Sequence, residues 1–143
     1  MYGTKVMKRM TMMANFSFED YQKETQVAVQ PHESEKDAVT HWTIGLTEEA
    51  GEVASLIKHR YYNNDRVSDE KIAEELGDVL WYVASICNEL DINLATVAQL
   101  NVGKLQYRYQ GEYTDGAVQQ RHNKMKKNKA TDEYKSLVTK LRR

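Results

Sequence analysis

The stretch Ser68–Leu90, SDEKIAEELGDVLWYVASICNEL, has the clearest helical pattern in the chain. Ser68 is a favourable N-cap, and the acidic residues after it suit the positive end of a helix dipole. Its apolar side chains recur at spacings of three and four residues, at Ile72, Leu76, Val79, Val83, Ile86 and Leu90. Residues at these spacings share one face of an α-helix. The stretch therefore predicts an amphipathic helix whose apolar face packs on other helices.

The same signals predict further helices on both sides of this stretch. Their approximate ranges are 17–30, 36–61, 94–109 and 131–141. Ser17 and Asp20 stand at the spacing of a capping box, and no stretch shows strand-like alternation. We therefore predict an all-α fold, an antiparallel helical bundle of four to five helices. Because the apolar stripes are modest, we expect the core to be completed by oligomerisation with further copies of the same chain.

The composition excludes several classes of protein. The chain has 143 residues, enough for one domain, and its 41% hydrophobic content is typical of a globular protein rather than a disordered one. No stretch reaches the roughly 18 apolar residues of a membrane span, so no membrane partner is expected. Cys87 is the only cysteine, which excludes an internal disulfide and fits a reducing compartment. We expect a cytoplasmic protein.

Charge is distributed unevenly along the chain. Residues 1–100 hold 9 Lys and Arg against 17 Asp and Glu, whereas residues 101–143 hold 11 against 4. Residues 1–12 show no periodicity, and we expect them to be a disordered N-terminal extension. We expect residues 122–143 to form a basic C-terminal tail or short helix, most simply a solvated one.

Two acidic motifs stand out on neighbouring predicted helices. Glu48, Glu49 and Glu52 spell E-E-x-x-E, and Glu75 and Asp78 spell E-x-x-D. Residues three or four apart share a helix face, so antiparallel packing of the two helices would bring four carboxylates together. Such charges repel one another unless a cation neutralises them. Oxygen ligands without His or Cys favour Mg²⁺ or Mn²⁺, ions suited to phosphate chemistry.

Each acidic motif also contains a glycine, Gly51 or Gly77. Glycine inside a helix costs about 1 kcal/mol relative to alanine. We therefore expect a close approach to the backbone at these two positions. An acidic helix is often only a solvated face, but apolar residues surround both motifs, which favours a metal site.

Taken together, the motifs resemble those of the MazG-like nucleoside triphosphate pyrophosphohydrolases. The resemblance lies in GLTEEAGEV at Gly45–Val53, EELGDVLWY at Glu74–Tyr82 and NVGKLQYRY at Asn101–Tyr109, with Tyr21 and Gln22 near its start. The spacer between Glu52 and Glu75 is 22 residues. The resemblance implies a domain over residues 13–121, and an all-α, usually dimeric or tetrameric fold.

The resemblance also implies an activity: Mg²⁺-dependent hydrolysis of a nucleoside triphosphate to the monophosphate and pyrophosphate, in nucleotide-pool cleaning. Glu49, Glu52, Glu75 and Asp78 would hold the magnesium ion, which manganese could replace. Glu48 would act as the catalytic residue that orients or deprotonates the attacking water. The expected substrate-binding residues are Tyr82, Asn101, Lys104 and Arg108, of which the last three follow one helix face.

Other functions stay open. A narrow dUTP or dCTP pyrophosphatase and a phosphoribosyl-ATP pyrophosphohydrolase would use the same fold and chemistry. A di-iron carboxylate bundle uses paired E-x-x-H motifs, and none of the four histidines follows a glutamate at that spacing. A non-enzymatic nucleic-acid-binding module would use the basic tail but leave the acidic motifs without a purpose, so a nucleic-acid partner is not expected.

Overall fold

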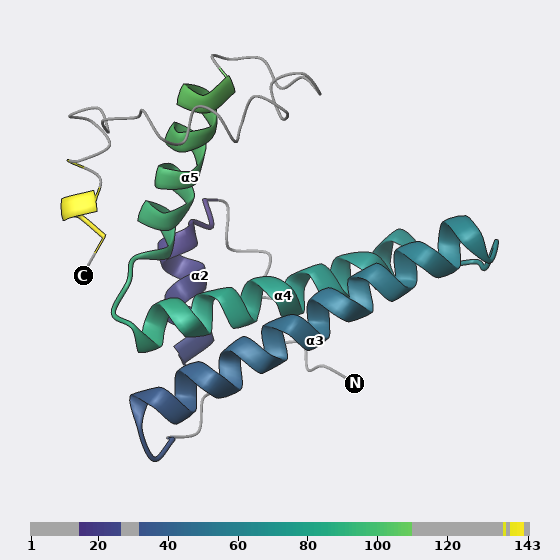
Figure 1. Cartoon of the computed structure of the whole chain (residues 1–143), viewed down its shortest axis with the longest axis horizontal. Coiled ribbons are helices and arrows are strands. Elements are labelled where there is room, and N and C mark those ends of the chain that lie inside the picture. Colours follow the sequence, from purple (N-terminus) through teal and green to yellow (C-terminus); the bar gives the residue numbers. More distant parts are fainter. Residues whose placement is uncertain (1–14, 27–31, 110–135, 137, 142–143) are drawn as a thin grey trace.

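The computed structural model describes residues 15–26, 32–109, 136 and 138–141 (Figure 1). Within these ranges the chain forms four helices and no strand, which confirms the all-α prediction. The helices are α2 (Phe18–Thr25), α3 (Glu35–Tyr62), α4 (Asp69–Glu89) and α5 (Leu94–Tyr109). The predicted extension at residues 1–12 lies outside the described ranges, as does most of the predicted basic tail at residues 122–143.

The helices begin where serine side chains cap them. Ser17 accepts a hydrogen bond from the backbone N–H of Asp20 at 3.1 Å, and its own N–H donates to the Asp20 carboxylate at 3.1 Å, which completes the predicted capping box. Ser34 and Ser68 cap α3 and α4 in a similar way. Helix α2 ends at Thr25 within the described residues, and residues 27–30 of its predicted range lie outside them.

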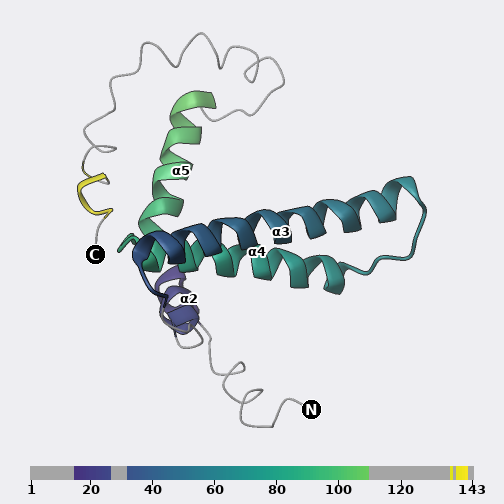
Figure 2. The same cartoon turned by 60° about the horizontal axis from the view of Figure 1, so that its bottom comes forward.

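Helices α3 and α4 form a long hairpin and lie side by side in both views (Figures 1 and 2). The 28 residues of α3 give it a length of about 42 Å. Arg60 stabilises the turn between α3 and α4, because its guanidinium donates hydrogen bonds to the Asp69 carboxylate at 2.6 Å and to the Val67 carbonyl at 3.1 Å. Asn64 allows the tight turn by adopting a positive φ of 56°.

Helix α2 connects the other end of the hairpin to α5. The fully buried Gln22 donates from Nε2 to the Ile92 carbonyl at 2.8 Å and accepts at Oε1 from the Leu94 N–H at 3.0 Å. One side chain thus satisfies two backbone groups of the turn between α4 and α5. Next to it, Ala84, Cys87 and Leu94 form a small buried cluster.

Helix α5 rises away from the axis of the hairpin and packs against α2 (Figures 1 and 2). Asn93 caps its first turn, since its side-chain oxygen accepts from the Thr96 N–H at 2.8 Å. The Asn93 N–H donates to the carbonyl of Leu141 at 2.9 Å, which attaches the C-terminal segment 138–141 to the start of α5. Among the described residues, no helix is long and apolar enough to cross a membrane.

Candidate metal centre

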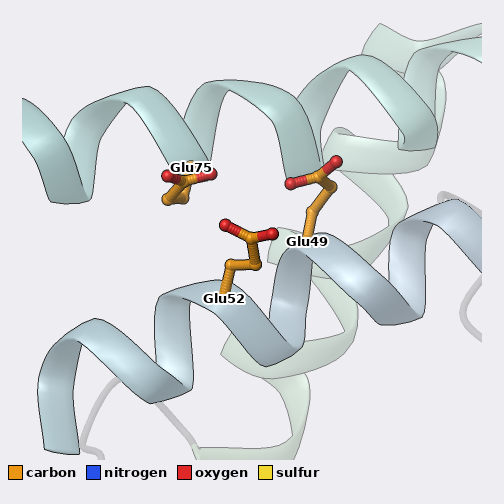
Figure 3. Close-up of side chains that lie close together, drawn as sticks. All are labelled: Glu49, Glu52 and Glu75. Atoms are coloured by element: carbon orange, nitrogen blue, oxygen red, sulfur yellow. The ribbon is translucent and has the colours of Figure 1, made fainter.

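Three of the predicted ligands converge between α3 and α4. Glu49 and Glu52 lie one turn apart on α3 and project toward α4, and Glu75 lies opposite them on α4 (Figure 3). Each contributes a carboxylate oxygen, and these oxygens all lie within 4.8 Å of one another. The convergence follows from the sequence, because spacings of three and four residues orient each motif inward once the two helices pair.

The three carboxylates differ in their exposure to solvent. Glu75 is buried, with 4% of its surface exposed, whereas Glu49 is half-buried and Glu52 is exposed. Partial burial raises the pKa of Glu49, and the neighbouring negative charges of Asp78, Glu52, Glu75 and Glu48 raise it further. The cluster therefore has the repulsion between like charges that a bound cation would relieve.

The dimensions of the cluster fit a divalent ion. Mg²⁺ binds oxygen at about 2.1 Å, so oxygens on opposite sides of one ion lie about 4.2 Å apart. The three carboxylate oxygens lie within 4.8 Å of one another, close to this separation, so one ion could contact all three after small side-chain adjustments. The ligands are all carboxylates, which suits Mg²⁺ or Mn²⁺ better than a metal that prefers nitrogen or sulfur.

Asp78, the fourth predicted ligand, lies outside this cluster but near it. It is exposed on α4, one turn beyond Glu75. Burial is the larger cause of the raised pKa of both Glu49 and Tyr21, and the negative charge of Asp78 raises each pKa further. The Tyr21 hydroxyl donates to the carbonyl of Gly77 at 3.4 Å. Helix α2 therefore contacts the acidic turn of α4 through the residue before Asp78.

Glu48, the predicted catalytic residue, is exposed on α3 beside Glu49. The pKa of Tyr82 is raised mainly by burial of its phenol and then by the charge of Glu49, and the charge of Glu48 makes a smaller contribution in the same direction. Glu48, Glu49 and Tyr82 are thus electrostatic neighbours, which places the predicted catalytic residue and one predicted substrate-binding residue at the same acidic turn.

Tyr82 is held in a group of aromatic rings. Its ring packs edge-on to Trp81 with centroids 5.0 Å apart and lies 6.2 Å from that of Trp42, which is itself buried. The Tyr82 ring also lies against the backbone of Gly45, where a Cβ atom would collide with it. This is the close backbone approach for which a glycine is needed.

The expected close approach at Gly51 and Gly77 is not found on the side of the backbone where a side chain would project, and the Tyr21 hydroxyl reaches only the carbonyl of Gly77. Among the described residues, no atom would lie within 4 Å of a Cβ atom added at either position, apart from the neighbouring backbone. Both glycines are exposed on the hairpin. Within the single chain the expectation is therefore wrong. The motif gives the position of each glycine in the sequence, but it does not say which face of the helix another element covers.

The predicted cationic face is on α5. Asn101 and Lys104 are exposed there, and Arg108 lies in the last turn of the helix, with its side chain outside what the structure describes. Since α5 packs on α2 and rises away from the hairpin, the single chain does not place this face alongside the acidic turns (Figure 2).

Lys71 is a site residue that the acidic motifs alone do not indicate. Its ammonium group lies 2.7 Å from Oε1 of Glu75 and 3.0 Å from Oε2 of Glu74. These two hydrogen-bonded carboxylates raise the pKa of Lys71. The spacing of four residues between Lys71 and Glu75 is the signal in the sequence, since oppositely charged residues at that spacing pair on a helix.

Comparisons with known proteins identify the family of the chain. The family model of the MazG nucleotide pyrophosphohydrolase domain matches residues 39–111, which include both acidic motifs and all of α5. The chain belongs to this family, and the resemblance seen in its motifs is confirmed.

The curated relatives are similar over shorter stretches. The Gene 37 protein of Mycobacterium phage L5 is 38% identical over 91 residues, which cover 59% of this chain and 80% of that protein. The uncharacterized protein YpjD of Bacillus subtilis (strain 168) is 42% identical over 52 residues, 34% of this chain and 47% of that protein. Neither name states an activity. No solved structure matches the chain significantly.

Proposed function

We propose that the protein hydrolyses nucleoside triphosphates to the monophosphate and pyrophosphate in a reaction that depends on Mg²⁺. The observation that carries this proposal is the convergence of Glu49, Glu52 and Glu75 from two helices of a chain in the MazG family. Hydrolysis between phosphates requires neutralised charge, a positioned phosphate chain and an activated water. An acidic cluster that fits a divalent ion supports the first two requirements.

The carboxylates have different roles in this proposal. Glu75 is fixed by burial, whereas the more exposed Glu49 and Glu52 can adjust to a cation, and Asp78 completes the ligand set from one turn further along α4. Mg²⁺, or Mn²⁺ in its place, supplies charge neutralisation for the phosphates. Glu48 orients the attacking water or accepts its proton; it is exposed, it precedes Glu49 on α3, and its charge contributes to the raised pKa of Glu49.

Substrate binding is assigned to Tyr82, Asn101, Lys104 and Arg108. Tyr82 supports this assignment by its position near Glu48 and Glu49. The residues of α5 supply positive charge for the phosphates, but α5 rises away from the acidic turns in the single chain. For these α5 residues to bind the phosphates, a second copy of the chain would have to bring its α5 next to the acidic turns.

The proposed assembly is a homodimer or homotetramer. The described part of the chain buries few apolar side chains, namely Ala38, Trp42, Ala84, Cys87 and Leu94. On the hairpin, Ile44 is 64% exposed and Leu76 is 51% exposed, and Gly51 and Gly77 leave open space beside the backbone. A second copy packing on the hairpin would cover this apolar surface.

The proposal is tested by measuring pyrophosphate release from each common ribonucleoside and deoxyribonucleoside triphosphate, with Mg²⁺ and with a chelator. We expect release that requires Mg²⁺. A broad substrate range supports a role in nucleotide-pool cleaning in the cytoplasm. Release from dUTP or dCTP alone would instead identify a narrow pyrophosphatase. Phosphoribosyl-ATP is included as a further substrate, and release from it alone would identify a phosphoribosyl-ATP pyrophosphohydrolase. Release from none of them by a folded protein would contradict the proposed activity.

A further inference from the structure

Lys71 is the cation that pairs with the acidic cluster. Among the described residues, the close contacts between basic and acidic side chains join His59 to Asp65, Arg60 to Asp69, and Lys71 to both Glu74 and Glu75. Only the last of these involves a member of the cluster. The Glu75 side chain is 5% exposed, so its charge needs a partner, and the ammonium at 2.7 Å supplies a charge-assisted hydrogen bond.

The position of this ammonium conflicts with that of a metal ion. A divalent ion bound to Glu75 would lie about 2.1 Å from a carboxylate oxygen. If both cations shared Oε1, they would be at most about 5 Å apart, a distance at which like charges repel appreciably. The two cations therefore compete for the same buried carboxylate.

In the same position the ammonium also contacts a second carboxylate, that of Glu74. Oε2 of Glu74 lies 3.0 Å from Nζ of Lys71, and both side chains are more than half exposed. The lysine side chain is long and flexible, so its ammonium can leave Glu75 and remain paired with Glu74. Exchange of the lysine for a metal ion then leaves no charge without a partner.

We propose that Lys71 is the internal counterion of the acidic cluster in the metal-free protein, and that a divalent ion must displace it from Glu75. Lys71 thereby sets the metal concentration at which the site fills. This inference rests on the proposed function, because it takes the cluster to be the binding site of a divalent ion.

The test is a calorimetric titration of the full chain with Mn²⁺ in the absence of nucleotide. Lys71→Met removes the competing charge, and we expect the Kd for Mn²⁺ to fall about threefold to tenfold, the effect of an ion pair of intermediate strength. The metal-free variant should also have a lower Tm than the wild type, because Glu75 loses its partner. Saturating Mn²⁺ should remove that difference in Tm.

Two further variants serve as controls. Lys71→Arg keeps the positive charge, so its Kd should stay within about twofold of the wild-type value. Lys36→Met removes the same charge from α3, but Lys36 precedes Glu49 by 13 residues, or about 20 Å along the helix. That distance exceeds the screening length of about 10 Å at 0.1 M salt, so its Kd should not change.

The outcomes separate this inference from the proposed function. An unchanged or higher Kd in Lys71→Met, with the wild type binding Mn²⁺, would overturn the counterion role and leave the metal site in place. A folded wild-type protein that binds neither Mn²⁺ nor Mg²⁺ would overturn the metal site and the inference together.

Discussion

The ring of Tyr82 on α4 lies against Gly45 on α3, at the place where any larger residue would put its Cβ atom. The contact is made four residues before Glu49 and four residues after Asp78, so it lies one turn from both acidic motifs. Gly45 thus determines how closely the two helices approach at the end of the candidate site.

Gly45→Ala should destabilise the protein, although alanine is the better helix former. The added methyl group forces the Tyr82 ring to move, and overpacking of this kind costs about 1–3 kcal/mol, which over most of that range exceeds the gain of about 1 kcal/mol in helix propensity. The free energy of unfolding, measured by chemical denaturation, should therefore fall.

Two comparisons isolate the steric cause. Gly103→Ala on α5 should stabilise the protein, because nothing among the described residues lies within 4 Å of the added Cβ. In a Tyr82→Leu background, Gly45→Ala should be neutral or stabilising, since the ring is gone. Equal destabilisation with and without the ring would refute the contact as the cause.

Glu52→Gln and Asp78→Asn should each abolish Mg²⁺-dependent pyrophosphate release without unfolding the protein. Both side chains are exposed, so neither substitution removes packing, and each removes a negative charge that the proposed metal ion requires. Far-ultraviolet circular dichroism should be unchanged. Full turnover in both variants would mean that the ligand set is wrong.

The helices are predictable from the sequence because their signals are local. Periodicity and caps place α4 and α5 within about one residue of their observed ends, as is possible when a pattern is strong and its caps are clear. The inward orientation of Glu49, Glu52 and Glu75 follows from their spacing and requires only that the two helices pair.

What the sequence does not predict depends on tertiary packing. Three glycines lie in or beside the acidic motifs, and the sequence does not distinguish Gly45, which has a ring against it, from Gly51 and Gly77, which are open. Similarly, the spacing of Asn101 and Lys104 places them on one face of α5 but does not say what that face meets. The direction of α5 is set by its packing on α2 and by the hydrogen bonds of the α2 glutamine to the turn before α5.

Gln22→Ala should destabilise the protein by about 2–4 kcal/mol, as expected when two buried backbone groups lose a partner and a cavity forms. The groups are the carbonyl of Ile92 and the N–H of Leu94. Gln26→Ala serves as the control, because it removes an exposed glutamine from the end of the same helix and should cost less than about 1 kcal/mol. Chemical denaturation of both variants measures the difference, and equal costs would contradict the bridging role.

The capping box of α2 should make stability depend on pH in the acid range. Hydrogen bonds from the Ser17 hydroxyl and backbone N–H lower the pKa of Asp20 below its ordinary value of 3.8. Because the pKa of Asp20 is lower in the folded protein than in the unfolded chain, its carboxylate stabilises the fold at pH values above the unfolded pKa. This stabilisation is lost as the pH falls through the folded pKa. Asp20→Asn should therefore lower Tm at pH 6, and the difference in Tm should shrink as the pH falls through the acid range. A difference in Tm that is independent of pH would show that the charge of Asp20 is not involved.

Ile44→Lys and Leu76→Lys should weaken self-association while leaving the fold of each chain intact. Both side chains are largely exposed in the single chain, so a lysine there should change its stability by no more than about 0.5 kcal/mol. In a dimer that buries the hairpin, the same lysine would place a charge in an apolar interface and leave it without a partner. Sedimentation analysis over a dilution series should show dimers or larger species for the wild type and a shift toward monomers for both variants. A wild-type chain that remains monomeric at high concentration would refute the assembly, and the positive charge of α5 would then have no proposed route to the acidic turns.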